Sequence, residues 1–200
     1  MFGFVRVLVT PALPVADIDT VVSLFTRDTH RMLAPVSYAA YLSVEASTRV
    51  FESIGAARES RVRLGVGART LTVSAAAVTP ELAALLQVPA VDGVVISDRL
   101  RRIEFAVVDQ FSGLRVPIDG LETSVAGVAP PELEGLYTGR AVDVWIPLRE
   151  DDIRGLDRTS RTFSVIGRLR RSAAGRRAGR GRCGCRPRCA RCSALHRAHT

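Results

Sequence analysis

One stretch limits the possible folds of this chain more than any other: Leu121–Leu148, which reads LETSVAGVAPPELEGLYTGRAVDVWIPL. It contains the only tryptophan, Trp145, and a proline pair, Pro130 and Pro131, between two dense apolar runs. Proline has no backbone N–H to donate to a neighbouring strand, so the pair must end whatever strand precedes it. The stretch therefore predicts β-structure on both sides of a proline turn.

The two apolar runs each alternate in the way a strand does. Thr123–Val128 is the first run and Ala141–Ile146 is the second. They are predicted to be strands of one sheet, joined by a connection of twelve residues. The indole of Trp145 is expected on one face of the second strand, where it covers an edge or a second layer. The opposite face is expected to carry Val142, Val144 and Ile146.

Charge is distributed very unevenly along the 200 residues. The net charge is +8, and all 28 basic residues are arginines. Residues 171–200 contain nine of these arginines and no acidic residue, which leaves 19 basic and 20 acidic groups in residues 1–170. The body is thus nearly neutral, and no nucleic-acid partner is expected for it. With 47% apolar residues, the chain can bury one ordinary core or two small lobes.

The N-terminal run Phe2–Val9 leaves three interpretations open. It has less than half of the roughly 20 apolar residues that a membrane-spanning helix needs. Arg6 interrupts the run, whereas a secretory signal carries its positive charge before the apolar part. The run is therefore the end of a truncated transmembrane helix, a weak signal, or an ordinary buried strand.

Periodicity predicts the order βαββα for the first half of the chain. Val21–Thr26 is rich in β-branched residues and predicts a strand. Ser37–Ile54 has apolar residues at helical spacing and predicts one kinked helix or two consecutive helices. Ser60–Val66 and Thr70–Val78 are predicted strands. A helix is expected to start at Thr79, because a capping hydroxyl, a proline and an acid follow one another there.

The second half predicts shorter elements. A buried strand is expected at Val94–Ile96, and a charged helix at Arg99–Phe105. Phe111–Ile118 should complete a small sheet. The polar stretch 149–161 is expected to be a loop, and Thr162–Leu169 is expected to be the last strand.

The C-terminal tail, 171–200, loses all apolar periodicity and is predicted to be disordered. We interpret it as the product of a shifted reading frame near Arg171, because GC-rich codons read out of frame encode Arg, Ala, Gly, Pro and Cys. The tail has thiol and imidazole groups that can bind zinc, but their spacing matches no zinc module and no apolar residues surround them. A metal site is therefore not expected. Its members would be Cys183, Cys185, Cys189 and Cys192, with His196 and His199 nearby.

The remaining polar residues do not form a catalytic pattern. His30 is the only histidine outside the tail, and it lies in a polar segment typical of solvated surface. Asp151 and Asp152 are adjacent acids of the kind found in solvated loops. Gly65 and Gly67 are too few for a phosphate-binding loop. The sequence predicts no catalytic residue, no cofactor and no enzyme activity.

Five blocks, taken in order, resemble a known family. They read LPVADID, VSYAAYLSVEASTRVFESI, TLTVSAAAVTPELAALLQV, VVISDRL and GVAPPELEGLYTGRAVDVWIPL. Over residues 13–170 the chain resembles the periplasmic core domain of MacB-type and FtsX-like ABC-transporter permeases. One departure is Arg102, which stands at or beside the position of a family tryptophan. The family's structural hallmarks match Pro130, Gly135, Trp145 and Pro147.

The resemblance implies an α+β fold. A ferredoxin-like βαββαβ lobe of the porter type would carry an inserted, smaller, mostly-β lobe. The implied boundaries are 19–90 with 158–170 for lobe one and 91–157 for lobe two. Residues 1–18 would then be the remnant of a transmembrane helix and its junction.

The resemblance also implies a function. Such a domain faces the periplasm at the cell membrane and transmits conformational change to a substrate or partner protein without catalysing a reaction. The implied partners are an ABC ATPase subunit or domain and other permease or periplasmic adaptor proteins, and this chain would be a truncated copy. Two alternatives remain: a free-standing soluble binding module, and a basic metal- or nucleic-acid-binding protein.

Overall fold

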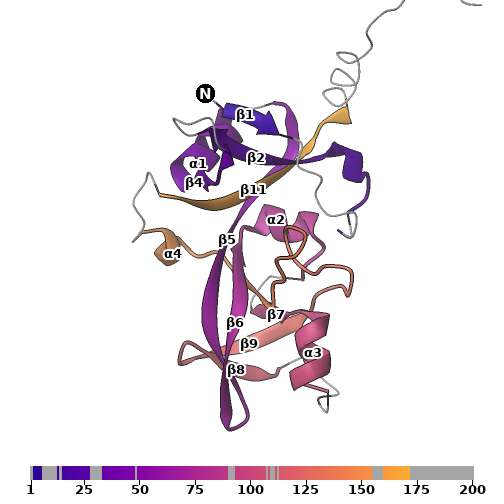
Figure 1. Cartoon of the computed structure of the whole chain (residues 1–200), viewed down its shortest axis with the longest axis vertical. Coiled ribbons are helices and arrows are strands. Elements are labelled where there is room, and N and C mark those ends of the chain that lie inside the picture. The colour runs from indigo at the N-terminus through magenta and orange to yellow at the C-terminus, as the bar shows by residue number, and fades with distance from the viewer. Residues whose placement is uncertain are drawn as a thin grey trace, which may run out of the picture.

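The computed structural model describes most of the chain up to Arg171. The described residues are 2–5, 13, 15–27, 33–47, 49–89, 93–106, 108, 111, 113–154 and 160–171. They form an elongated molecule with two lobes stacked along its long axis (Figure 1). We call the lobe that carries β1, β2, β11, α1 and α2 the upper lobe, and the lobe that carries β7, β8, β9 and α3 the lower lobe.

Eleven strands form one mixed sheet. Their bounds are β1 (Phe2–Val5), β2 (Val21–Arg27), β3 (Leu33–Ala34), β4 (Val36–Ser37), β5 (Phe51–Val66), β6 (Arg69–Val78), β7 (Val94–Ile96), β8 (Arg115–Ile118), β9 (Leu121–Val128), β10 (Val144–Pro147) and β11 (Arg161–Leu169). The helices are η1 (Ile18–Thr20), α1 (Tyr38–Ser47), α2 (Pro80–Leu85), α3 (Asp98–Glu104) and α4 (Glu150–Arg154). This mixed sheet with few helices confirms the predicted α+β class.

The upper lobe is an open sheet in the order β1-β2-β11-β5-β6, with every neighbouring pair antiparallel. Helix α1 lies over one face, where it encloses a core of Tyr41, Phe163 and Val165. Helix α2 lies on the other face, where Leu82 and Leu86 are fully buried. The last strand, β11, returns from the far end of the chain and lies between β2 and β5. The six elements β2, α1, β5, β6, α2 and β11 therefore follow one another as βαββαβ.

The lower lobe is a closed barrel. Its strands follow the order β5-β6-β10-β7-β9-β8, and β8 pairs again with β5 through Ile118 and Leu64. The pairs β6–β10 and β7–β9 are parallel, and the others are antiparallel. Closure gives the barrel an interior, which Leu64, Ile96 and Val144 fill with buried side chains. The pairing of β8 with β5 means that neither β8 nor β5 is a free end strand of the barrel.

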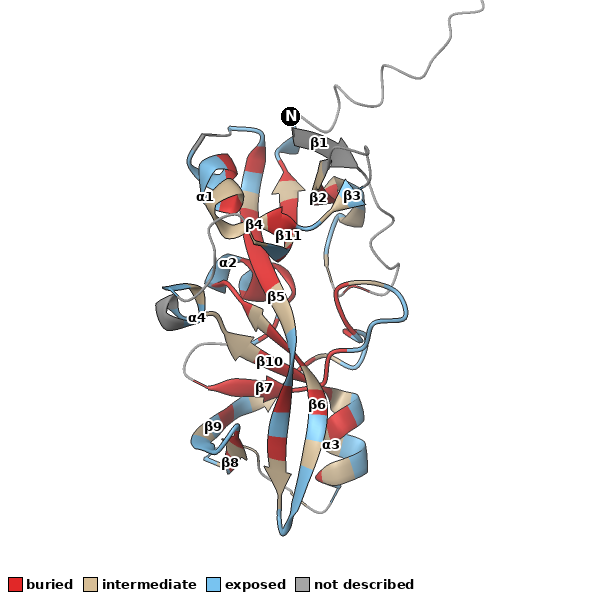
Figure 2. Cartoon of the chain, turned by 60° about the vertical axis from the view of Figure 1, so that its left-hand side comes forward, coloured by how far each residue is buried: buried red, intermediate tan, exposed pale blue. Residues whose placement is uncertain are grey.

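The two lobes share the β5–β6 hairpin (Figure 1). Its strands pair without a register shift from Ala57 opposite Val78 to Val66 opposite Arg69. Gly67, in the turn at the tip, has a φ of 57°, a conformation that suits glycine because it has no Cβ. Near its open end β5 pairs with β11, and near its tip it pairs with β8. Figure 2 shows that buried residues run along this hairpin in both lobes.

Local sequence signals place two of the helices as predicted. Thr79 precedes α2 in an extended conformation, Pro80 occupies the first turn, and Glu81 lies near the positive end of the helix dipole. The predicted cap by the Thr79 hydroxyl was wrong, because that oxygen accepts a hydrogen bond from the N–H of Ala56 in β5 at 3.2 Å. In α3, the side-chain oxygen of Ser97 accepts a hydrogen bond from the N–H of Leu100 at 3.1 Å. That bond caps the helix, because it satisfies a donor that has no partner within the helix.

Three local predictions were wrong. The predicted helix Ser37–Ile54 ends at Ser47, and Phe51–Ile54 begins β5, because pairing with β11 buries the two apolar side chains in a sheet. The predicted loop after Leu148 contains α4. Val142 packs with Trp145 and not with Val144, because it precedes β10 and does not follow the alternation of that strand.

The N-terminal run is described only at residues 2–5, which form β1 and pair antiparallel with β2. Residues 2–5 therefore form a strand, which agrees with the third of the three interpretations of the N-terminal run. Within the described residues, no helix is long and apolar enough to cross a membrane.

Candidate functional site

The waist of the molecule, where the two lobes meet, contains strand β10 and the connection that leads to it, which together carry the predicted hallmark residues Pro130, Gly135, Trp145 and Pro147. The connection from Ala129 to Asp143 leaves β9, rises beside α2 and returns to β10 (Figure 1). Pro130 starts this connection, and its carbonyl accepts a hydrogen bond from the N–H of Leu133 at 2.9 Å. Gly135 lies against the carbonyl of Arg140, and a Cβ at Gly135 would collide with that oxygen.

Trp145 and Pro147 belong to β10. Trp145 is fully buried and packs among residues of the upper lobe and the connection, including Leu82, Leu136 and Ile166. The next residue, Ile146, points to the other side and packs against the barrel interior. The prediction that the indole lies opposite Val144 and Ile146 is therefore confirmed. The tryptophan is the central side chain of the packing between the lobes.

Asp143, buried at the start of β10, ties three elements together. Its N–H donates to the carbonyl of Ser74 in β6 at 2.9 Å, and its Oδ2 accepts from the N–H of Ser74 at 3.1 Å. Its carbonyl accepts from the N–H of Ser97, the N-cap of α3, at 2.8 Å. Its Oδ1 accepts from the guanidinium of Arg99 in α3. One carboxylate thereby joins the shared hairpin to the helix of the lower lobe.

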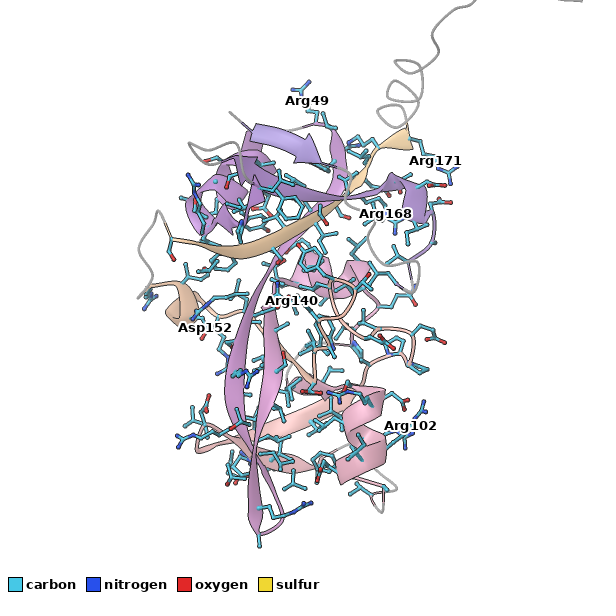
Figure 3. All side chains as sticks on the ribbon, in the orientation of Figure 1. Arg49, Arg102, Arg140, Asp152, Arg168 and Arg171 are labelled. Carbon is cyan, nitrogen blue, oxygen red and sulfur yellow. The ribbon has the colours of Figure 1, made fainter. Side chains whose placement is uncertain are left out.

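A second ion pair joins the connection to the hairpin. Arg140 donates to Glu59 Oε2 in β5 at 2.6 Å, and Figure 3 shows Arg140 beside the hairpin at the waist. Tyr137, near this pair, lies with its ring centroid 6.5 Å from that of Phe25 in β2. Burial raises the pKa of Tyr137 above its usual value. The connection thus reaches from the lower lobe to the upper sheet.

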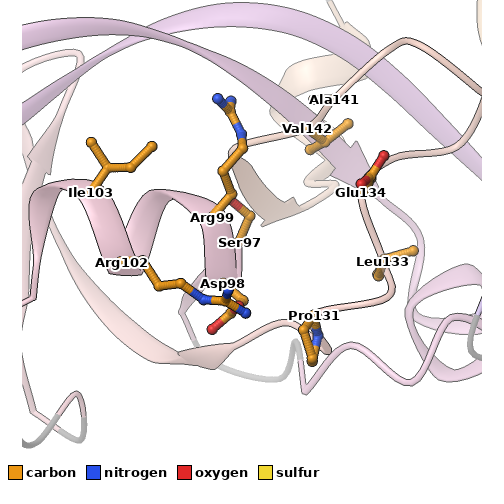
Figure 4. A pocket seen from close by; sticks show the side chains of 10 residues that line it. All are labelled: Ser97, Asp98, Arg99, Arg102, Ile103, Pro131, Leu133, Glu134, Ala141 and Val142. Carbon is orange, nitrogen blue, oxygen red and sulfur yellow. The ribbon is translucent and has the colours of Figure 1, made fainter.

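A cavity of about 270 Å³ opens between α3 and the connection (Figure 4). Its charged groups are Arg99 and Arg102 with Asp98 on one wall and Glu134 on the other. The guanidinium of Arg102, and then that of Arg101, holds the pKa of Asp98 below its usual range. The mostly apolar remainder of the lining is Ser97, Ile103, Pro131, Leu133, Ala141 and Val142.

The chemistry at the waist consists of packing, hydrogen bonds and ion pairs. The arginines of the cavity are paired with aspartates, Arg99 with Asp143 and Arg102 with Asp98. Among the residues that the structure describes, no three His, Cys, Asp or Glu side chains lie close enough together to hold a metal ion. The contacts at the waist therefore hold the two lobes in a fixed relative position.

Several predicted residues lie elsewhere. His30 and the cysteines and histidines of the tail are outside the described residues. Asp152 is exposed, and its Oδ2 accepts a hydrogen bond from the N–H of Arg149 at 2.9 Å. Asp17, which has a φ of 53°, pairs with Arg171 at 3.0 Å. The structure thus places Asp152 in helix α4 and Asp17 in the turn before η1.

Sequence reasoning missed Asp143 and Arg99. The signal for Asp143 is visible afterwards: it is an acid directly before the apolar run of β10 and beside the tryptophan strand. A carboxylate at such a place needs donors, because burial of an unpaired charge is costly. The donors come from Ser74 and Arg99, which lie 69 and 44 residues away along the chain. No local pattern indicates partners at that distance.

The chain is similar in fold to solved domains of transport proteins. The periplasmic region of MacB from Actinobacillus actinomycetemcomitans has a TM-score of 0.56 and 14% identity, with 84% of this chain and 86% of that chain covered. The extracellular domain of the noncanonic ABC-type transporter YknZ from Gram-positive bacteria has a TM-score of 0.55 and 10% identity, with 80% and 88% covered.

A domain assigned to a permease protein from Porphyromonas gingivalis has a TM-score of 0.54 and 13% identity, with 80% of this chain and 75% of that chain covered. No protein-family model and no curated protein matches the sequence. The fold is therefore that of the periplasmic domains of MacB-like permeases, which confirms the resemblance at the level of the fold.

Proposed function

We propose that this chain is the extracytoplasmic domain of an ABC-type permease and that it passes movement from the membrane to a substrate or partner protein without catalysing a reaction. The observation that carries the proposal is the β5–β6 hairpin, which runs through both lobes as one uninterrupted pair of strands. The likeness in fold to MacB and to the YknZ transporter supports the same role.

The physical reason is stiffness. A paired hairpin with buried residues on its faces resists bending, because bending would break ladder hydrogen bonds and open the packed cores. Asp143 and Trp145 fix the lower lobe to this hairpin, so a displacement of the upper sheet moves the barrel as well. Rigid lobes that move together are a recognised way to transmit a conformational change.

The proposal includes the following parts. Lobe one comprises residues 19–90 with 158–170, lobe two comprises 91–157, and the preceding residues 1–18 are the junction with the membrane. An ABC ATPase subunit or domain supplies the energy, and other permease or periplasmic adaptor proteins receive the movement. The domain faces the periplasm at the cell membrane.

The decisive experiment combines the gene and its product. The gene is sequenced with several hundred bases on either side, and the whole chain is cross-linked in cells and purified from solubilised membranes. We expect a transmembrane helix to be encoded upstream of Met1, or in another frame after Arg170, and a P-loop ATPase to co-purify. Flanks without such helices, together with membranes free of the chain, would refute the permease role.

One observation favours a second candidate, a free-standing binding module. Residues 2–5 pair with β2 as part of the sheet, which places the N-terminus in the fold. Limited proteolysis distinguishes the two candidates. A soluble module keeps its N-terminal strand under protease, whereas a membrane junction is cut before β2. Mass spectrometry of the protected fragment gives the answer.

A further inference from the structure

The shared strand β5 has a short interval with no strand on one side. Its first part pairs with β11 as far as Arg58, opposite Phe163, and its last part pairs with β8 at Leu64. Between these points, no described strand pairs with β5 on the side away from β6. Figure 1 shows this side of β5 between α4 above and β8 below.

The backbone direction in this interval follows from the neighbouring hydrogen bonds. Arg63 donates its N–H to Asp119 Oδ1 at 2.9 Å, and its carbonyl accepts from the N–H of Asp119 at 2.8 Å, so both groups point away from β6. Backbone groups alternate in direction along a strand, and the β5–β6 register is unbroken here. The N–H and the carbonyl of Arg61 therefore also point to the open side.

Asp119 occupies the position next to this open interval and pairs with the backbone of Arg63. Its backbone and its carboxylate together satisfy both backbone groups of Arg63, as a residue of a neighbouring strand would. The described part of the structure has no such neighbour for Arg61. A backbone N–H and carbonyl without partners at a sheet edge can form hydrogen bonds with an added strand.

A cavity of about 390 Å³ lies at the same place, between the two lobes. Three arginines line it: Arg58, Arg61 and Arg149. Arg58 donates to the carbonyl of Asp152 at 3.1 Å, and among the described residues Arg61 and Arg149 have no carboxylate partner. The two acids of the lining are already engaged, Asp119 with Arg63 and Asp152 with the N–H of Arg149. The lining thus carries three arginines against two aspartates, so positive charge is in excess around the open backbone groups.

Apolar surface completes the cavity. Ile146 is half-buried, and Leu121 is 71% exposed. Because side chains alternate along a strand, Arg58 lies on the face of β5 that also carries Val62, toward Ile146 and the barrel core, whereas the Arg61 side chain lies on the opposite face. The acidic residues of an extended segment can therefore meet Arg58 and Arg149 at the cavity, and Arg61 adds positive charge beside the edge. The volume falls within the range of cavities that bind ligands.

We propose that the open side of β5 at Arg61 binds a short, extended, acidic segment of a partner protein. The N–H and the carbonyl of Arg61 form two backbone hydrogen bonds with the segment, and the carboxylates of the segment pair with Arg58 and Arg149. This is the addition of a strand to a sheet edge, with charge providing the selectivity. The proposal rests on the edge and the cavity, and it does not depend on the permease role.

The probe is a fluorescent heptapeptide in which glutamate alternates with valine, titrated into the whole chain and followed by anisotropy. The control peptide has glutamine in place of glutamate. We expect saturable binding of the acidic peptide that weakens as salt is added, and clearly weaker binding of the glutamine peptide. The two peptides binding equally, or neither binding at millimolar concentration, would overturn the proposal.

Amide hydrogen exchange on the unaltered chain tests the geometry. The Arg61 amide should exchange freely without peptide and become protected when peptide is added. The amides of Ser60 and Val62 point toward β6 and should be protected in both states. An Arg61 amide that is already protected in the free chain would show that the chain itself, or a second copy of it, fills the edge, and the proposal would then fall.

Two variants of Arg61 distinguish the contribution of its charge to peptide binding from that of its backbone N–H. Arg61→Ala keeps the N–H and should weaken binding about two- to fivefold, as expected for loss of an exposed charge. Arg61→Pro removes an N–H that is not used in pairing with β6, and should weaken binding about tenfold more. Arg69→Ala, at the tip of the same hairpin, is the matched control and should bind like the unaltered chain. Equal effects of Arg69→Ala and Arg61→Ala would contradict the assigned site.

Discussion

The upper and lower parts of β5 bury the same face of one strand in two different ways. In the upper lobe, Ile54 and Ala56 face a core closed by helix α1 on an open sheet. In the lower lobe, Val62 and Leu64 face the interior of a closed barrel. Between them the same face carries Arg58 and the exposed Ser60, which line the cavity between the lobes. Arg58 and Ser60 thus interrupt the apolar face of β5, and the apolar residues above and below them belong to two separate cores.

The opposite face of the hairpin is different. There Ala57, Ala76 and Val78 pack in the same core as Trp145, and the face becomes polar from Glu59 onward. The core of the waist therefore lies on one face while the cavity lies on the other. The lobes are joined by apolar packing on the Trp145 side and separated on the Arg58 side. Five predictions test this difference.

Trp145→Ala should have the largest effect, because it removes the central side chain of the core at the waist. We expect a loss of about 3–5 kcal/mol in the free energy of unfolding. Urea titration followed by far-ultraviolet circular dichroism measures it, with Trp145→Phe as the milder control. A loss below 1 kcal/mol would mean that this face does not join the lobes.

Asp143→Ala should rank next, with a loss of about 2–3 kcal/mol, because Ser74 and Arg99 lose charged hydrogen bonds. Asp143→Asn keeps the shape and one acceptor and should lose less. Amide exchange distinguishes a local from a global effect: residues of α3 should open before those of β11. Equal exchange in both places would show that Asp143 does not hold α3 to the hairpin.

Gly135→Ala should destabilise the fold by about 1–3 kcal/mol, the usual range for forcing extra volume into a packed site. The added methyl group meets the carbonyl of Arg140 and forces apart the two arms of the connection. Gly113→Ala tests a different glycine, at a φ of 85° in open space, where only backbone strain arises. Thermal unfolding of both variants compares a steric clash with strain.

Asp98 gives a pH dependence to the lower lobe. The neighbouring arginines hold its pKa below the unfolded value of about 3.9, so its contribution to stability is complete above that pH. The contribution is lost as the pH falls through the lowered pKa, and it stays below about 1 kcal/mol because both arginine partners are exposed to solvent. Unfolding titrations between pH 5 and pH 2 should show a smaller acid loss for Asp98→Asn. An unchanged acid loss would contradict the ion pairs.

Ser60→Val should have the smallest effect, within about 0.5 kcal/mol, because the residue is exposed at the polar interruption. Its informative readout is the cavity. A valine there extends the apolar stripe from Ala56 toward Val62, and it should raise binding of a hydrophobic dye at the waist. No change in dye binding would show that the two cores are separated by more than these two polar residues.

Local structure was largely predictable from the sequence. The strands β2, β6, β7 and β11, and the starts of α2 and α3, follow from alternation and capping residues that lie within a few positions of one another. The alternation around Trp145 also placed its indole on the correct face. Such signals are short in range, and the chain satisfies them without reference to distant residues.

Prediction failed where burial by distant strands competes with local spacing. Phe51 and Ile54 have helical spacing, but β11, more than 100 residues later, draws them into a sheet. The sequence predicted that β9 and β10 belong to one sheet, and only the fold shows that β7 lies between them.

The sequence by itself determined strands such as β2, β6, β7 and β11, the starts of α2 and α3, and the face on which Trp145 lies, because these depend on the spacing of neighbouring side chains. The tertiary structure alone decided that β8 returns to β5 to close a barrel, that Asp143 finds its donors in Ser74 and Arg99, and that β5 is left open at Arg61. The physical reason is that strand pairing satisfies backbone groups, which are nearly identical in every residue, so the choice of partner depends on the packing of the whole chain.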